Sequence, residues 1–210
     1  NTRVQVEHPI TEMITGIDIV QEMIKVSYGH ELSIKQEDIS IKGHAIECRV
    51  CAEDPDNNFL PTPGTVIYAK SPQGPGVRDD SSLFNGYEVT TFYDPMLSKL
   101  IVWSENREGA IKRMSRALSE YVVLGVKTNL GFLVRLMNDK DFISGKLDTG
   151  FIEKHKKLLK IPKDNSNIAT IASAIILHSG IGVDNLKRDP RFTPWKYIAR
   201  GSSVSRNSMF

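Results

Sequence analysis

The chain has 210 residues, and its 40% hydrophobic content is sufficient to bury the core of a globular protein. Its 27 basic and 25 acidic side chains give a formal net charge of only +2, which excludes the strongly basic surface typical of nucleic-acid-binding proteins. No apolar run in the sequence has the length of a membrane span. We therefore expect a globular protein that binds neither nucleic acid nor membrane.

The first nine residues alternate between apolar and polar side chains. Val4 and Val6 are separated by polar residues and Pro9 ends the run, so the pattern predicts a short strand. Thr2, Val4 and Val6 would face a core, and the other face would carry Asn1, Arg3, Gln5 and Glu7. Such a row suits a small planar oxyanion, with the carboxylate as a potential general base. The alternative is a solvated strand face on which Arg3 and Glu7 neutralise each other.

A helix is predicted next, with Thr15 and Asp18 at its start and Gly29 at its end. Residues 30–43 predict a connection between two lobes. His44 to Val50 alternate again, which predicts a strand with Glu47 and Arg49 on one face. If this strand lies near the first, Arg49 converges with Arg3 and Glu7 on one anion. The alternative is a structural ion pair of Arg49 with Glu47 or Glu53.

Cys48 and Cys51 have C-x-x-C spacing, but residues three apart on a strand point to opposite faces. The sequence has no second pair of cysteines to complete a zinc site. We therefore predict free thiols and a reducing compartment, either the cytoplasm or, in a eukaryote, the mitochondrial matrix.

Turn-forming residues divide the middle of the chain into short strands, predicted at 65–69, 87–93 and 97–103, which favours a mainly antiparallel sheet. Asp94 and Lys99 are interpreted as a turn acceptor and a solvated charge. An apolar stripe from Glu105 predicts a helix, Asn129 could cap a second, and a third is expected from Thr149 to about Lys160. A linker, a short apolar helix and a mobile tail are expected beyond residue 160.

The run N-T-R-V-Q-V-E-H-P-I-T-E resembles the signature that ends the ATP-grasp domain of biotin carboxylases. The resemblance covers about the first 160 residues and continues through G-H-A-I-E-C-R-V-C-A-E-D-P near residue 50, F-L-P-T-P-G at 59–64, Y-D-P-M-L-S-K-L-I at 93–101 and G-V-K-T-N at 125–129. It implies an α+β fold. The last strand and helix of an ATP-grasp domain would occupy residues 1–40. A biotin carboxylase C-terminal domain, a mainly antiparallel sheet with packed helices, would occupy 41–160, and a linker, short helix and tail 161–210.

Biotin carboxylases use ATP and Mg²⁺ (or Mn²⁺) to phosphorylate bicarbonate, and the carboxyphosphate then releases carbon dioxide beside the ureido ring of biotin. The resemblance implies that Arg3, Gln5 and the backbone of Val6 bind bicarbonate. It implies that Glu7 is the general base that deprotonates bicarbonate. Arg49 matches the residue that stabilises the enolate-like oxygen of deprotonated biotin.

Asn1 matches a residue near the metal in this family. The resemblance also implies several partners: bicarbonate, a biotin carrier domain that is not in this chain, a carboxyltransferase subunit, and further copies of the chain in a homo-oligomer. The family's nucleotide-binding lobe corresponds to sequence upstream of Asn1. We therefore expect a piece of a longer enzyme that is inactive alone.

The apolar segment near residue 170 favours the alpha subunit of an acyl-CoA carboxylase (propionyl-, acetyl- or methylcrotonyl-CoA) as the parent. The alternatives are the biotin carboxylase part of pyruvate carboxylase and a non-catalytic assembly module of such a complex. A carbamoyl-phosphate synthase is disfavoured, because its corresponding stretch lacks Q-V-E-H-P.

Overall fold

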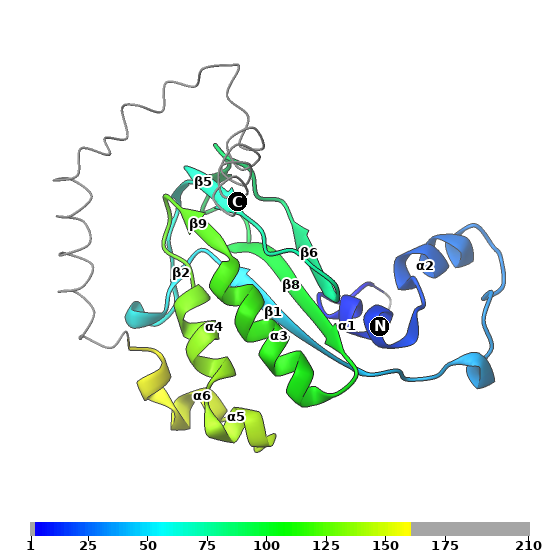
Figure 1. The fold of residues 1–210 in the computed structure, drawn as a ribbon. Coiled ribbons are helices and arrows are strands. Elements are labelled where there is room, and N and C mark those ends of the chain that lie inside the picture. The colour runs from blue at the N-terminus through cyan, green and yellow to red at the C-terminus, as the bar shows by residue number, and fades with distance from the viewer. Residues whose placement is uncertain (1–2, 161–210) are drawn as a thin grey trace, which may run out of the picture. The chain divides into compact units, whose positions relative to one another are not determined.

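In the computed structural model, which describes residues 3–160, the chain folds as helices packed on antiparallel strands (Figure 1). The central three-stranded sheet has the order β1-β8-β6 and consists of β1 (His44–Cys51), β8 (Met96–Ser104) and β6 (Val77–Ser81). Both of its ladders are antiparallel. The expected α+β class with a mainly antiparallel sheet is therefore confirmed. The linker, helix and tail expected beyond residue 160 lie outside the described residues.

Three two-stranded antiparallel ladders accompany the sheet. They pair β2 (Glu53–Asp54) with β3 (Leu60–Pro61), β4 (Gly64–Thr65) with β7 (Glu88–Val89), and β5 (Tyr68–Lys70) with β9 (Val122–Leu124). The strand predicted at 65–69 is thus divided between β4 and β5, and the one predicted at 87–93 shrinks to two residues. Short 3-10 helices lie at η1 (Gln36–Asp38) and η2 (Pro55–Asn57).

Helices α3 (Arg107–Glu120) and α4 (Leu130–Met137) cover one face of the central sheet (Figure 1). Asn106 caps α3, since its side chain accepts the N–H of Gly109 at 2.8 Å. The main core is buried between these helices and the alternate strand residues Ile46, Cys48, Val50, Leu100 and Val102. Strand alternation therefore directs Glu47 and Arg49 to the opposite face.

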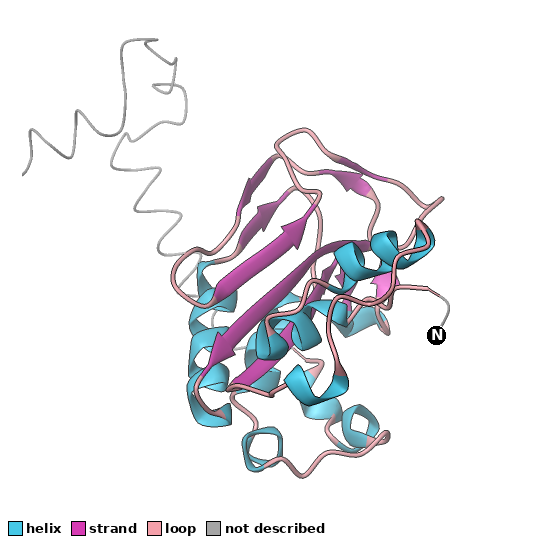
Figure 2. Cartoon of the chain, turned by 90° about the vertical axis from the view of Figure 1, so that its right-hand side faces the viewer, coloured by secondary structure: helices cyan, strands magenta, loops and turns pink. Residues whose placement is uncertain are grey.

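That opposite face of the sheet is covered by α1 (His8–Thr15), so that helices lie on both sides of the strands (Figure 2). Pro9 on α1 and Ile101 on β8 are fully buried. Arg78 on β6 donates to Glu12 on α1 at 2.7 Å, which ties this helix to the edge of the sheet. The polar face of β1 therefore lies beside the segment that precedes α1.

The predicted helix near residue 20 is α2 (Ile19–Ser27), capped by Asp18, which accepts the N–H of Gln21 at 2.8 Å. The lysine-rich helix predicted from Thr149 is instead divided into α6 (Phe151–Lys154) and the 3-10 helix η3 (Lys156–Leu158). An additional short helix, α5 (Lys140–Ser144), precedes them. Within residues 3–160, every helix is too short or too polar to span a bilayer.

Candidate active site

Residues 3–5 are irregular and lead through a turn at residues 6–7 into α1, so the predicted strand is wrong in this segment. The N–H of His8 donates to the carbonyl of Gln5 at 3.2 Å, and that of Ile10 to the carbonyl of Glu7 at 3.1 Å. Val4 is 38% exposed, so the expected dry face does not form. The physical reason is Pro9, which occupies the first turn of α1, where its missing N–H has no partner to lose.

The side chain of His8 fixes this turn, a contact that the sequence pattern does not reveal. Its Nδ1 lies 2.7 Å from the carbonyl oxygen of Gln5. Because a carbonyl oxygen can only accept, Nδ1 is the protonated nitrogen in this contact. In the motif, Pro9 therefore favours the start of α1, and His8 fixes the backbone carbonyl of Gln5.

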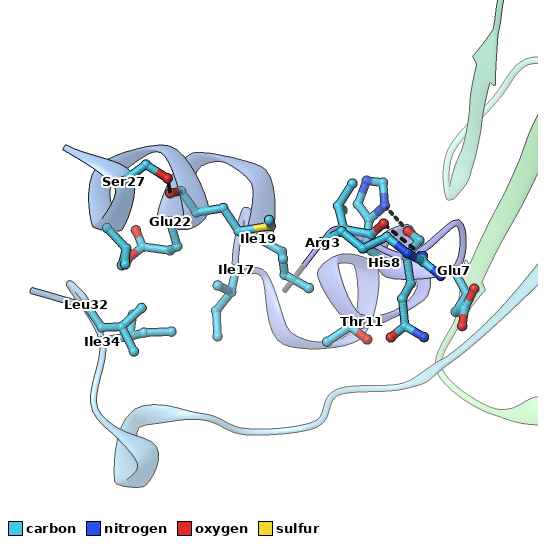
Figure 3. A pocket seen from close by; sticks show the side chains of 14 residues that line it. Arg3, Glu7, His8, Thr11, Ile17, Ile19, Glu22, Ser27, Leu32 and Ile34 are labelled. Atoms are coloured by element: carbon cyan, nitrogen blue, oxygen red, sulfur yellow. Dashed lines mark hydrogen bonds between the residues drawn. The ribbon is translucent and has the colours of Figure 1, made fainter. Parts of the chain in front are cut away.

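Arg3, Gln5 and Glu7 line a cavity of about 640 Å³, and Figure 3 shows Arg3 and Glu7 at the same end of it. The remaining wall is mostly apolar and includes Ile17, Ile19, Met23, Val26, Leu32 and Ile34. The side chain of Val6 is not among the lining residues, and Asn1 lies outside the described residues. The turn thus gathers three of the predicted site residues without forming a strand.

Arg49 reaches Glu7 from the strand β1. Its Nη2 donates to Oε2 of Glu7 at 3.0 Å, and both side chains are about half exposed. Figure 3 shows Glu7 pointing from the turn towards the strands. The alternative pair with Glu47 exists only as a longer contact, 4.0 Å from Nε of Arg49 to Oε1. The structure therefore brings Arg49 and Glu7 together across 42 positions of sequence.

Asn129 fixes the backbone of β1 on either side of Val50. Its Nδ2 donates to the carbonyl of Arg49 and its Oδ1 accepts the N–H of Cys51, both at 3.0 Å. The side chain makes no capping hydrogen bond to α4, although the residue occupies the cap position. The residue predicted as a helix cap thus links α4 to β1 and fixes the backbone position of Arg49.

The donor set of the site suits an anion of carbonate size. Nη1 of Arg3 donates to the carbonyl of Val4 at 3.2 Å, and the rest of its five-donor fork is exposed. The guanidinium of Arg3, the amide of Gln5 and the carboxylate of Glu7 can bind a planar oxyanion and exchange a proton with it. Arg49 contacts Glu7 but is not among the residues that line the cavity.

The same residues do not fit a magnesium site. The carboxylates that line the cavity are Glu7 and Glu22. Glu7 is paired with Arg49, and Glu22 accepts from Lys25 at 2.7 Å and from Ser33 at 2.6 Å. The hydrogen bonds from Lys25 and Ser33 lower the pKa of Glu22 to about 2. Magnesium is usually bound through one or two carboxylates together with water and phosphate oxygens. Because both carboxylates here are engaged, a metal would have to be held by residues outside this set.

Cys48 and Cys51 are free thiols, as predicted. Burial raises the pKa of each to about 12, so neither is a thiolate near neutral pH. Asp94 also has its predicted role, since Oδ1 accepts the N–H of Met96 at 2.8 Å. Lys99 is not the solvated charge that was predicted, because its side chain is only 15% exposed and pairs with Asp80 at 3.5 Å.

Two family models match the chain. The biotin carboxylase C-terminal domain matches residues 47–154, and the carbamoyl-phosphate synthase L chain ATP binding domain matches residues 1–35. These ranges lie on either side of residue 41, and the boundary expected there stays a prediction.

Similar proteins include a pyruvate carboxylase subunit of Methanothermobacter thermautotrophicus, 48% identical over 85% of this chain and 38% of the relative. Biotin carboxylase 1 of Bacillus subtilis is 48% identical over 74% of this chain and 34% of the relative. The chain therefore spans about a third of the length of the curated relatives it matches.

A solved structure of the biotin carboxylase domain dimer of Hydrogenobacter thermophilus 2-oxoglutarate carboxylase, in complex with MgADP, ADP and bicarbonate, has a TM-score of 0.76 and 45% identity. The match covers 78% of this chain and 36% of that one. The biotin carboxylase subunit of a pyruvate carboxylase has the same TM-score and identity. Because the C-terminal domain model spans more than half of the residues and the fold agrees, the chain belongs to the biotin carboxylase family.

Proposed function

We propose that the chain is the C-terminal part of an ATP-dependent biotin carboxylase, which carboxylates carrier-bound biotin with bicarbonate. The observation that carries this proposal is the contact of Arg49 with Glu7, at a turn that also places Arg3 and Gln5 at the cavity. Relatives named as biotin carboxylases support it, with 44–50% identity.

In this proposal, Arg3 binds bicarbonate, and Gln5 and the backbone N–H of Val6 orient it. The carboxylate of Glu7 accepts the proton of bicarbonate. The resulting carbonate oxygen attacks the terminal phosphorus of ATP, so that ADP leaves and carboxyphosphate forms. Fixing the anion in this geometry is worth several kcal/mol of barrier, by order of magnitude.

Carboxyphosphate then splits into carbon dioxide and phosphate, and the phosphate takes the proton of the ureido N–H of biotin. Arg49 stabilises the negative charge that this leaves on the ureido oxygen while the nitrogen attacks carbon dioxide to form carboxybiotin. This role requires Arg49 to exchange Glu7 for a substrate oxygen. The pair is half exposed on both sides, and such pairs are worth only about 0–1 kcal/mol. An incoming oxyanion can therefore displace Glu7 at little cost, whereas Lys at this position would lose the forked contact.

The nucleotide and Mg²⁺ (or Mn²⁺) would be held mainly by residues outside 3–160, with Asn1 near the metal. When bound, the metal neutralises charge on the phosphates. The proposed partners are the biotin carrier domain, a second copy of the chain and a carboxyltransferase subunit. The free thiols fit the cytoplasm, or the mitochondrial matrix in a eukaryote.

The final acceptor is the finer part of the proposal, because a separate carboxyltransferase chooses it. The apolar segment near residue 170 favours an acyl-CoA. The names of similar proteins, which include subunits of a pyruvate carboxylase and of a 2-oxoglutarate carboxylase, favour a keto acid. Transfer of labelled carboxyl groups from carrier biotin to each acceptor, in the presence of the cognate carboxyltransferase, decides between them.

The test uses the complete polypeptide that carries this chain. Wild-type protein should release ADP from ATP in the presence of bicarbonate, and biotin should stimulate the release. Arg49→Ala should lower the biotin-stimulated rate by about 10²-fold or more, the usual effect of removing a charge-stabilising donor, and leave the oligomeric state intact. Arg116→Ala is the matched control, since Arg116 is exposed and pairs with Glu120 on α3. A non-catalytic assembly module would show no biotin-stimulated ADP release in any variant.

A further inference from the structure

Glu47 is a buried carboxylate with an incomplete set of contacts. Its side chain is only 4% exposed. Its Oε2 is buried and has no hydrogen-bond partner within the described part of the chain. Leaving a carboxylate oxygen in this condition costs free energy, so Glu47 requires an explanation other than fold stability.

Glu47 lies two residues before Arg49 on β1, and alternation puts the two side chains on the same face. Nε of Arg49 is 4.0 Å from Oε1 of Glu47, whereas Nη2 of Arg49 is 3.0 Å from Glu7. The guanidinium thus has a carboxylate near its Nε as well as one at Nη2. Glu7 is 52% exposed and Glu47 is buried, so only the first contact is open to exchange with solvent or a ligand.

Nearby positive charges offset part of the cost of burying Glu47. Burial raises the pKa of Glu47, and the positive charges of Lys99 and Arg49 oppose this. Lys99 is already engaged by Asp80, which also accepts two hydrogen bonds from Arg78. Arg49 is therefore the neighbouring cation that can exchange its main partner, the exposed Glu7, for a ligand.

We propose that Glu47 is a positioning residue that holds the Nε edge of Arg49 while its Nη2 edge exchanges Glu7 for the substrate oxyanion. Solvent screens the attraction to Glu47 less than the attraction to Glu7, because Glu47 is buried and the local dielectric is lower there. The guanidinium of Arg49 can then break its contact with Glu7 and keep its orientation. This inference rests on the proposed function, in which Arg49 acts on the ureido oxygen of biotin.

The decisive variant is Glu47→Gln in the complete polypeptide, which keeps the shape of the side chain and removes its charge. We expect the biotin-stimulated kcat to fall about 10- to 100-fold, the scale of a misplaced catalytic group, with the KM for ATP unchanged. The Tm should stay equal or rise, because the buried charge, one oxygen of which has no partner, is replaced by a neutral amide. A structural role would instead lower the Tm together with the activity. Glu108→Gln is the matched control, as Glu108 is 76% exposed and pairs with Lys112 on α3.

A second pair of variants tests whether Glu47 acts through Arg49. In an Arg49→Lys background, Glu47→Gln should lower kcat by less than twofold, because the forked contact is already lost. Wild-type kcat in Glu47→Gln, or equal losses in both backgrounds, would overturn the inference. If the wild-type polypeptide shows no biotin-stimulated ADP release, the proposed function fails. Suppose instead that the wild-type polypeptide shows this release, that Arg49→Ala loses it and that Glu47→Gln keeps the wild-type rate. In that case only the proposed role of Glu47 fails.

Discussion

At the scale of single residues, Asn129 holds the strand that carries Arg49. The residue is 6% exposed, and its amide makes two hydrogen bonds to the backbone of β1, donating to the carbonyl of Arg49 and accepting the N–H of Cys51. Asn129→Ala leaves both groups without this partner and should lower the free energy of unfolding by about 2–4 kcal/mol. Chemical denaturation measures this loss.

The control for Asn129 is Asn138→Ala, which removes an exposed amide that donates to the carbonyl of Val134 on α4. It should cost less than about 1 kcal/mol, because solvent replaces an exposed hydrogen bond. Equal losses in the two variants would contradict the cross-linking role of Asn129.

Some of these residues can be predicted from the sequence and others cannot. Arg3, Glu7 and Arg49 stand out because charged side chains interrupt an apolar alternation within a specific motif. Asn129 has the sequence context of an ordinary helix cap, so its contacts to β1 depend on tertiary packing. Glu47 is predictable as a neighbour of Arg49, but its burial depends on tertiary packing that the local sequence does not reveal.

At the scale of elements, the sequence predicts β1, β8 and α3 because each has the apolar periodicity of its class. It does not predict β6, where Arg78, Asp79 and Asp80 occupy the strand interior. Their charges are satisfied by Glu12, Ser98 and one another, a pattern that no hydrophobic period reveals. Nor does it predict α1, since Pro9 is compatible both with a strand end and with a first helical turn.

The attachment of α2 to the following connection depends on Glu22. Its carboxylate accepts from Lys25 and from both the hydroxyl and the N–H of Ser33, and these hydrogen bonds lower its pKa from 4.5 to about 2. A carboxylate whose pKa is lower in the folded state stabilises the fold above its unfolded pKa, and this contribution is lost as pH falls through the folded pKa.

Glu22→Gln should therefore lower the Tm at pH 7, and the difference from wild type should narrow as pH falls from 4.5 towards 2. Thermal unfolding followed by circular dichroism over this range measures both. Glu105→Gln, at an exposed turn position before α3, serves as the control. A deficit of constant size at every pH would show that Glu22 contributes packing and not charge.

At the scale of the whole molecule, the site is assembled from two parts of the chain that α1 brings together. The turn before α1 supplies Arg3, Gln5 and Glu7, and the sheet supplies Arg49. Glu12 secures this arrangement, because Oε2 pairs with Arg78 on β6 and Oε1 accepts the N–H that starts α2. One helix thus couples the position of the turn that carries Arg3, Gln5 and Glu7 to the sheet and to the cavity wall.

The described residues at the cavity supply Arg3, Gln5, Glu7 and an apolar wall, but no free carboxylates for a nucleotide-bound metal. Both carboxylates there are engaged, Glu7 by Arg49 and Glu22 by Lys25 and Ser33. We therefore expect the 210-residue chain alone neither to bind MgATP tightly nor to cleave it. For the isolated chain, isothermal titration calorimetry should detect no binding at micromolar MgATP, and added biotin should cause no release of ADP. The complete polypeptide should bind MgATP and release ADP when biotin is added. Biotin-dependent ADP release by the isolated chain would mean that its own residues hold the nucleotide. The inference that the nucleotide and metal are held by residues outside this chain would then be wrong.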